Sequence, residues 1–107
     1  MKYQIFILED AEIDILEIFQ YIAVNDSSSK ADRFIEALEK KCNSLSSFAK
    51  RGHIPPELDR VSIFNYLEIN YKTYRIIYQL VENHVFIHCI LDGRRDLAEL
   101  LHSRLLR

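Results

Sequence analysis

The sequence predicts a single α+β domain over residues 1–107, with an N-terminal strand and an α-helical hairpin packed on a mainly antiparallel sheet of about four strands, and a C-terminal helix. Two observations lead to this fold class. Apolar residues recur at helical spacing in two consecutive segments of the first half, whereas the second half contains dense runs of Ile, Val, Tyr and Phe. With 49% hydrophobic and 28% charged residues, the 107-residue chain has the size and composition of one globular domain.

The first two elements are indicated by a change of pattern at an acidic pair. The apolar run Tyr3–Leu8 is typical of a strand, and its shortage of polar residues predicts burial on both faces. Glu9-Asp10 then suits a helix N-terminus. From Ala11 to Ile22, apolar residues recur at helical spacing with acidic residues between them, which predicts an amphipathic helix with an acidic outer face.

A serine-rich segment, Asn25–Ser29, interrupts this helical pattern. Ser29, with Asp32 three residues later, fits a capping box, so we expect a second helix to begin there. The apolar stripe of this helix ends at Leu45. Two amphipathic helices joined by so short a turn are expected to lie antiparallel and to share their apolar faces with a sheet.

Helical periodicity is lost over Ser46–Asp59, where Pro55-Pro56 marks a loop leading to the sheet. Three strand-like runs follow, at Val61–Tyr71, Thr73–Val81 and Val85–Leu91. The third run has little polarity on either face, which predicts a central strand. The turn before it, Glu82-Asn83, suits a tight hairpin because Asn tolerates a positive φ.

The chain leaves the last strand at Asp92-Gly93, where Gly93 is expected to give the freedom for a sharp turn. A C-terminal helix should begin directly afterwards, so that Arg94 and Arg95 lie in its first turn. One face of this helix is a leucine stripe, made of Leu97, Leu100, Leu101 and Leu105.

Charge and apolar content limit the classes of protein to which the chain can belong. The formal net charge of −2 and the pI near 6.1 give no basic excess, so nucleic-acid binding would require a local cationic patch. Two sets of cations are candidates: Arg51, Arg60, Lys72 and Arg75, and Arg94, Arg95, Arg104 and Arg107. No signal peptide and no run of about 20 apolar residues is evident, which predicts a cytoplasmic protein without membrane contact.

The cysteines and histidines do not indicate a metal or cofactor. Cys42 and Cys89 lie in different predicted elements and form no CxxC motif, which favours two free buried thiols over a disulfide. The four histidines are not spaced as metal ligands. We therefore expect neither a metal site nor a cofactor.

The predicted order of elements, strand, two helices, three strands and a helix, resembles that of the RelE/ParE superfamily of bacterial type II toxins. Four ordered segments carry this resemblance: Arg51–Leu58, Tyr74–Tyr78, Leu91–Asp96 and Arg104–Leu106. The resemblance implies a small cognate antitoxin with which the chain forms a hetero-oligomer. It also implies one of two activities, since RelE-like toxins cut mRNA on the ribosome whereas ParE-like toxins inhibit DNA gyrase.

Residues at the positions of the nuclease site favour the second activity. Metal-free RNA cleavage needs an acid, a base and fixed positive charge around the phosphate. By resemblance, Arg75 and Arg95 match the arginines of RelE-like toxins, but Leu101 occupies the position of a tyrosine that takes part in proton transfer or stacking. His102 is adjacent, yet one helical residue rotates a side chain by about 100°. The sequence is therefore interpreted as a ParE-like plasmid stabilisation toxin, a gyrase inhibitor that arrests growth and is neutralised by a ParD-like antitoxin, and not as an enzyme.

Two other functions remain alternatives. A ribosome-dependent mRNA interferase acting on ribosome-bound mRNA would use Arg75 and Arg95 for charge, with His53, His88 or His102 as acid–base groups. A non-toxic module would retain only antitoxin binding. Contacts with a target or an antitoxin are expected from a larger set of residues, comprising Arg75, Arg94, Arg95, Leu101, Arg104, Leu105 and Arg107.

Several of these residues also have a purely structural interpretation. Arg75 either binds a target or anchors the sheet to a carboxylate such as Glu57 or Glu68. The Arg94-Arg95 pair forms either a functional patch or salt bridges with neighbouring aspartates. His88, within an apolar strand, is more typical of a hydrogen-bonded core histidine than of a catalyst.

Overall fold

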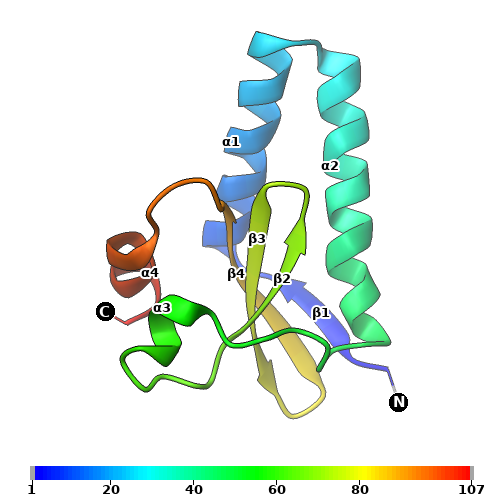
Figure 1. Cartoon of the computed structure of the whole chain (residues 1–107). Helices are drawn as coiled ribbons and strands as arrows, with labels where there is room; N and C mark the ends of the chain where they lie inside the picture. The colour runs from blue at the N-terminus through cyan, green and yellow to red at the C-terminus, as the bar shows by residue number, and fades with distance from the viewer. Residues whose placement is uncertain (1, 107) are drawn as a thin grey trace.

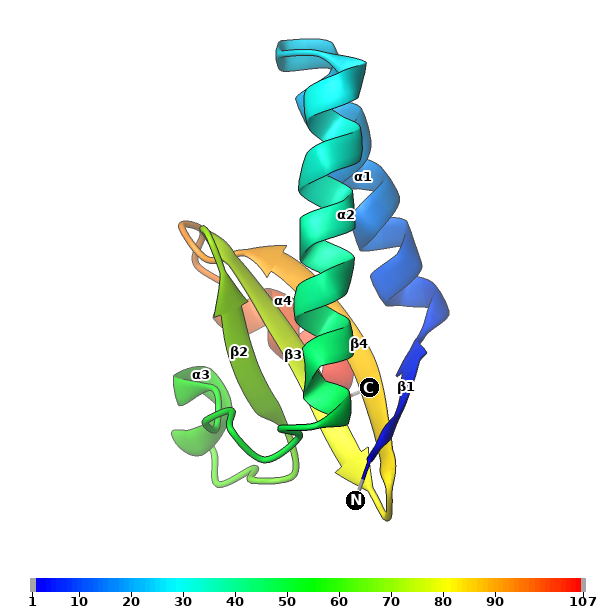
Figure 2. The same ribbon diagram turned by 90° about the vertical axis from the view of Figure 1, so that its right-hand side faces the viewer.

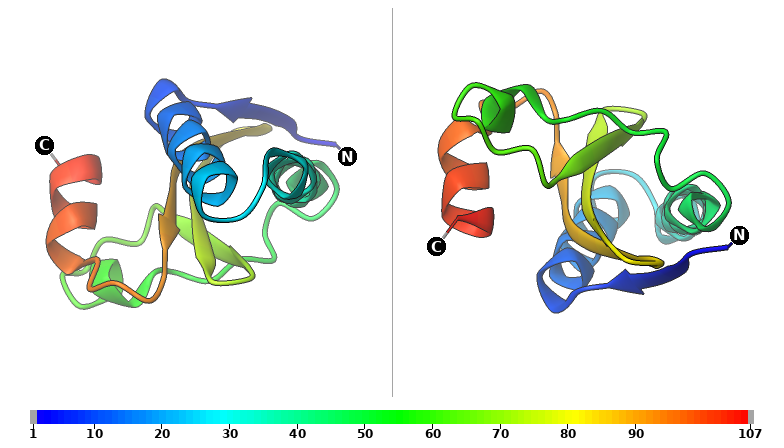
Figure 3. Two further views of the ribbon diagram at one scale, coloured as in Figure 1. Left: turned by 90° about the horizontal axis from the view of Figure 1, so that it is seen from above. Right: turned by 90° about the horizontal axis from the view of Figure 1, so that it is seen from below.

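A computed structural model describes residues 2–106 and has three layers, with a four-stranded sheet between two layers of helices. The long hairpin of α1 and α2 covers one face of the sheet and projects beyond it, while α4 and the short α3 lie on the other face (Figures 1 and 3). The elements are β1 (Gln4–Ile7), α1 (Glu9–Asn25), α2 (Ser28–Asn43), η1 (Ser44–Ser46), α3 (Pro56–Asp59), β2 (Leu67–Tyr71), β3 (Tyr74–Val81), β4 (His84–Asp92) and α4 (Ala98–Leu105).

The sheet has the strand order β1-β4-β3-β2. β1 is parallel to β4, and the other two pairs are antiparallel, which confirms the mainly antiparallel sheet and the central position of β4. The prediction that the first strand is buried on both faces is wrong. Gln4 and Phe6 are exposed, because β1 is an edge strand and the helices cover only the face that carries Ile5 and Ile7. Figure 2 shows β1 at this edge, beside β4.

Each face of the sheet has its own core. The core below the hairpin contains Leu38 and Cys42 from α2, together with Ile76 and Tyr78 from β3. The core on the opposite face contains Ile77 and is closed by Leu58 of α3, by Leu97 directly before α4, and by Leu101 of α4. Alternate side chains along β3 therefore enter the two cores. Cys42 and Cys89 are both buried free thiols, in agreement with the sequence.

One irregularity in β4 changes which core its residues enter. Ile77 pairs with Cys89 whereas the next residue, Tyr78, pairs with Ile87, so His88 is an extra residue in β4. Because of this bulge, Ile87 and Ile90 both face the core below the hairpin, although they are three residues apart. A strict period of two cannot predict this arrangement.

Several boundaries differ from the sequence prediction, among them the starts of α2 and β2. α2 begins at Ser28, and the cap is Ser27, whose hydroxyl accepts a hydrogen bond from the Lys30 backbone N–H at 3.1 Å. The strand predicted to begin at Val61 begins instead at Leu67, because the preceding residues form turns. Tyr66 is nevertheless buried in the core below α4, which explains why this irregular segment is apolar.

The turns also differ in detail. In the β3–β4 hairpin the positive φ of 56° falls on Glu82 and not on Asn83. Gly93 does not have a positive φ, so backbone freedom is not the reason for this glycine. A Cβ at Gly93 would lie 3.0 Å from the Thr73 carbonyl oxygen and 3.0 Å from Cγ of Arg75. Glycine suits this position because the neighbouring atoms leave little room for a side chain.

The C-terminal helix is shorter than predicted. α4 begins at Ala98, so Arg94 and Arg95 precede it in a turn and do not lie in its first helical turn. Asp96 accepts a hydrogen bond from the Ala98 backbone N–H at 3.2 Å, which satisfies one free donor of the helix N-terminus. Among the described helices, none combines the length and apolar character needed to cross a membrane.

Candidate functional site

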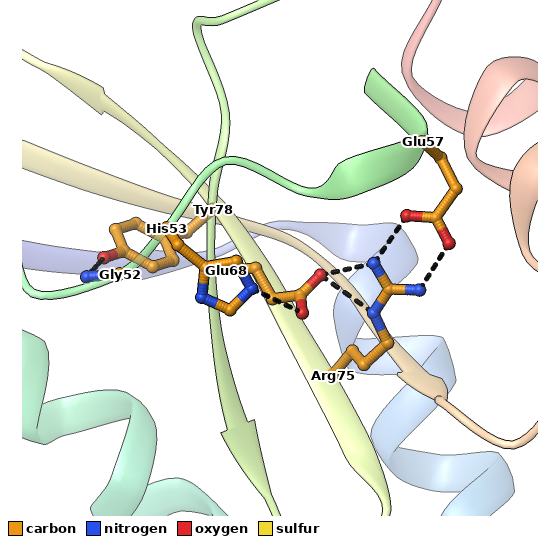
Figure 4. A network of polar contacts seen from close by, with 6 residues as sticks. All are labelled: Gly52, His53, Glu57, Glu68, Arg75 and Tyr78. Carbon is orange, nitrogen blue, oxygen red and sulfur yellow. Dashed lines mark hydrogen bonds and ion pairs between the residues drawn. The ribbon is translucent and has the colours of Figure 1, made fainter. Parts of the chain in front are cut away.

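Arg75 forms the centre of a polar network on the α3 side of the sheet (Figure 4). Its guanidinium donates two hydrogen bonds to Glu57 of α3, both at 2.7 Å, and its Nε donates to Glu68 of β2 at 2.8 Å. The other oxygen of Glu68 lies 3.2 Å from Nε2 of His53. The His53 backbone also bridges to Glu68, which fixes the loop before α3 against the edge of β2.

Burial makes this network a stable internal ion cluster. The side chains of Arg75 and Glu68 are only 11% and 5% exposed. Hydrogen bonding to Glu57, and then to Glu68, raises the pKa of Arg75, and the reciprocal hydrogen bond from Arg75 lowers the pKa of Glu57. Two carboxylates therefore neutralise one guanidinium, and the cluster has no positive charge left for a phosphate group.

The lowered pKa of Glu57 predicts a loss of stability in acid. Because the pKa is below its ordinary value of 4.5 in the folded state, ionised Glu57 contributes stability that is fully present above pH 4.5 and is lost as the pH falls through the lowered pKa. We expect the urea midpoint of unfolding to change little between about pH 7 and 5 and to decrease below that range. Glu57→Gln should show a smaller decrease, and an unchanged acid dependence in that variant would contradict this assignment.

A second ion cluster connects elements from the two ends of the chain. Asp14 of α1 accepts hydrogen bonds from Arg104 of α4 at 2.9 and 3.2 Å, and from the Ile90 backbone N–H of β4 at 2.9 Å. Arg104 also donates to the His88 carbonyl oxygen at 3.3 Å and lies 3.8 Å from Asp10. The side chain of Arg104, predicted to contact a partner, is thus only 17% exposed and is held by internal carboxylates.

Asp14 is a buried polar residue that was not among the predicted site residues, although the sequence contains a signal for it. Asp14 lies three residues after Ala11 and four before Ile18, on the buried side of α1. An acidic residue within an apolar helical stripe requires a partner. The identity of that partner, 90 residues away, could not be inferred from spacing.

The turn between β4 and α4 carries two exposed cations, Arg94 and Arg95, and we call residues 92–96 the elbow. Arg94 pairs with Asp92 at 2.7 Å and is largely exposed. These bonds from Arg94 lower the pKa of Asp92 to about 2. Among the described residues, none forms a hydrogen bond or ion pair with the Arg95 side chain, which lines three neighbouring hollows beside α1 and α4.

The elbow and α1 together form a groove. Its walls carry Glu17 and Tyr21 from α1, and Tyr74 and Arg95 from the sheet and elbow. Arg95 therefore differs from Arg75, since its charge faces an open surface that contains both aromatic and acidic groups. Of the predicted site arginines that the structure describes, Arg94 and Arg95 are the two whose side chains are exposed to a partner.

The three predicted histidines have different surroundings. His53 is exposed and contacts Glu68, whereas His102 is exposed on α4. His88 is half-buried, lies 3.2 Å from the Gln79 side chain and packs edge-on against Tyr66. Burial, and then the nearby charge of Arg104, lower its pKa. Within residues 2–106, no group of three or more His, Cys, Asp or Glu side chains is arranged to hold a metal ion.

The predicted leucine contacts are mainly internal. Leu101 is completely buried in the core below α4, so it contributes to packing and not to an exposed contact surface. Leu105 is half-buried at the margin of the same core. Arg107 lies outside the described residues.

Comparison with known proteins agrees with this architecture. A family model described as the ParE toxin of the type II toxin–antitoxin system parDE matches residues 5–97. No curated protein sequence is similar to the chain.

Two of the solved structures that share the fold belong to toxin–antitoxin systems. One belongs to the chromosomal ParDE toxin–antitoxin system of P. aeruginosa, with a TM-score of 0.68, 13% identity, and coverage of 83% of this chain and 94% of that one. The other belongs to the RelBE2 toxin–antitoxin complex of Mycobacterium tuberculosis, with a TM-score of 0.63, 17% identity, and coverage of 84% and 96%. The family match covers most of both cores, the Arg75 cluster and the elbow, and this chain therefore belongs to the ParE toxin family of type II toxin–antitoxin systems.

Proposed function

We propose that this toxin acts by binding DNA gyrase and inhibiting it, that it does not cleave RNA, and that a ParD-like antitoxin neutralises it. The observation that carries the proposal is that two carboxylates, those of Glu57 and Glu68, neutralise the positive charge of Arg75. An arginine that stabilises the transition state of phosphate cleavage must offer uncompensated charge to the substrate. The guanidinium of Arg75 is instead bonded to both Glu57 and Glu68.

The acid–base requirement supports the same proposal. A general acid or base must approach the reacting group within hydrogen-bonding distance. Leu101 has no titratable group and is fully buried, while His88 has a half-buried ring that contacts Gln79 and Tyr66. Arg95 remains a surface charge suited to a protein contact, since arginine is enriched among the residues that dominate interface affinity.

Purified gyrase provides the direct test. We expect the wild-type toxin to inhibit supercoiling by gyrase and to convert plasmid into cleaved DNA, with growth arrest in cells while mRNA remains intact. Arg95→Glu should weaken inhibition by about tenfold or more, as expected for the loss of a charged contact together with new repulsion. Arg33→Glu, which places the same change on the exposed side of α2, is the matched control and should inhibit like the wild type.

Other outcomes would assign the toxin differently. Cleavage of ribosome-bound mRNA, with gyrase unaffected, would show that the protein is an interferase. Antitoxin binding without growth arrest or gyrase inhibition would show a non-toxic module.

A further inference from the structure

The end of the domain where α2 finishes gathers cations without acids. Residues 40–53 contain four lysine and arginine residues and no aspartate or glutamate. Lys40 lies 3.9 Å from Glu36 of the same helix. Within residues 2–106, Lys41, Lys50 and Arg51 form no ion pair with a carboxylate. This segment therefore carries positive charge that no carboxylate of the described chain neutralises.

Hydrogen bonds bring the cationic segments together at this end. The Ser44 hydroxyl accepts a hydrogen bond from the Arg51 guanidinium at 2.5 Å and donates one to the Lys41 carbonyl oxygen at 2.5 Å. The Tyr3 backbone N–H donates to the Ser46 carbonyl oxygen at 2.8 Å, which places the N-terminal segment beside the same turn. We call the four cations that gather here the basic end: Lys2, Lys41, Lys50 and Arg51.

The surface of the basic end offers several donors to an anion. Lys50 and Arg51 line an open hollow of about 390 Å³ together with Tyr3, Ser47 and Phe48. Within residues 2–106, the Lys50 backbone N–H donates to no other residue, so it adds a donor to the two cationic side chains and the serine hydroxyl. Phe48 is 63% exposed, and its ring can pack against a sugar or a base.

Exposure separates the basic end from the arginines that carboxylates hold. Arg75 and Arg104 are largely buried and are bound by acidic side chains, whereas Lys50 and Arg51 are exposed. A nucleic acid fits such a surface better than an acidic peptide. Its phosphates recur at short and regular spacing, so several cations can each meet one, and the release of condensed counterions adds to the affinity.

We propose that the basic end binds the phosphate backbone of the DNA that gyrase holds, while the elbow contacts the gyrase protein. This proposal rests on the proposed function, because it takes the complex of gyrase with DNA as the target. Contacts from lysine and arginine to phosphates carry no sequence information, so binding should not depend on the DNA sequence.

The positions of the two surfaces allow both contacts at once. The basic end lies near the first residue of β4, since the Gln4 N–H donates to the Asn83 carbonyl oxygen at 3.0 Å. The elbow begins at the last residue of β4, and a strand of nine residues is roughly 26 Å long. Figure 1 shows the end of α2 and the chain between β4 and α4 at opposite ends of the sheet. One toxin molecule can therefore bridge a protein and the DNA bound to it.

DNA binding is measured first, with the free full-length toxin and a short fluorescent duplex in a salt titration. Four phosphate contacts predict a slope of about 3–4 for log Kd against log salt. Lys50→Gln/Arg51→Gln should lower this slope by about 2 and raise the Kd about tenfold or more at low salt. Lys30→Gln/Arg33→Gln removes two exposed cations from the other end of α2 and is the matched control, which should leave the slope unchanged.

Gyrase inhibition is measured with charge reversals at the same positions. Lys50→Glu/Arg51→Glu should raise the toxin concentration needed for half-inhibition of supercoiling by about tenfold. The control, Lys30→Glu/Arg33→Glu, makes the same change in net charge and should stay within about threefold of the wild type. Circular dichroism verifies that each variant is folded, and the glutamine variants repeat the comparison without introducing acids.

The possible results separate this proposal from the proposed function. If the wild type inhibits gyrase and the basic-end variants inhibit it equally, with an unchanged salt slope, the DNA contact is disproved and the proposed function stands. If the wild type does not inhibit gyrase, both fail. Binding to single-stranded RNA about tenfold tighter than to the duplex would assign the basic end to a different nucleic acid and overturn the proposal.

Discussion

Replacing Arg75 with methionine is expected to lower the free energy of unfolding by about 3–5 kcal/mol, because it leaves two carboxylates without their cation. Glu68 is 5% exposed and Glu57 is 17% exposed, so water cannot take over the role of the guanidinium. Domains of this size are stable by about 5–15 kcal/mol, and the variant should therefore be close to unfolding at 37 °C. Urea denaturation measures the change directly.

Two further variants test whether the unpaired carboxylates cause the loss of stability in Arg75→Met. Arg33→Met removes an exposed arginine from α2 and should change stability by less than about 0.5 kcal/mol. Combining Arg75→Met with Glu57→Gln and Glu68→Gln should recover part of the loss, because no buried charge then remains unpaired. If Arg75→Met instead keeps nearly full stability but abolishes gyrase inhibition, Arg75 is a target contact and its role as an anchor is disproved.

The helical hairpin shows what sequence can predict in this fold. The apolar residues of α2 recur with a period that only a helix satisfies, and they are buried as that period requires. The starts of β2 and α4 could not be located in this way. Tyr66 and Leu97 are buried in the core below α4 although they precede their strand and helix, so burial there reflects tertiary packing and not periodicity.

In the candidate site, too, some contacts could be predicted from the sequence and others could not. The sequence identified Glu57 and Glu68 as possible partners of Arg75, because a cation between apolar neighbours needs a carboxylate. It could not show that both bind at once, since this depends on the register between β2 and β3 and on the position of α3. Long-range pairs such as Asp14 with Arg104 depend on the complete fold.

Gly52→Ala is expected to destabilise the domain by about 3 kcal/mol through a steric clash and lost hydrogen bonds. A Cβ at this position would lie 2.5 Å from the hydroxyl oxygen of Tyr78 and 2.8 Å from the backbone oxygen of Glu68. The same hydroxyl accepts a hydrogen bond from the Gly52 N–H at 3.2 Å (Figure 4). It also donates a hydrogen bond to the Ala49 carbonyl at 2.7 Å, so it cannot move away without losing both. The conformation of the loop before α3 therefore requires a glycine at position 52.

A double-mutant cycle with Tyr78→Phe separates the two contacts. Tyr78→Phe alone should cost about 1–3 kcal/mol, because it leaves polar groups of Ala49 and Gly52 without this partner. The double variant should be less destabilised than the sum of the single variants, by about 1 kcal/mol, since the phenol oxygen that clashes with the new methyl group is gone. The loss of stability that remains in the double variant measures the clash between the new methyl group and the backbone oxygen of Glu68. Gly93→Ala, whose closest contacts are 3.0 Å, is the matched control and should cost less. Strict additivity in the cycle would show that the phenol does not restrict Gly52.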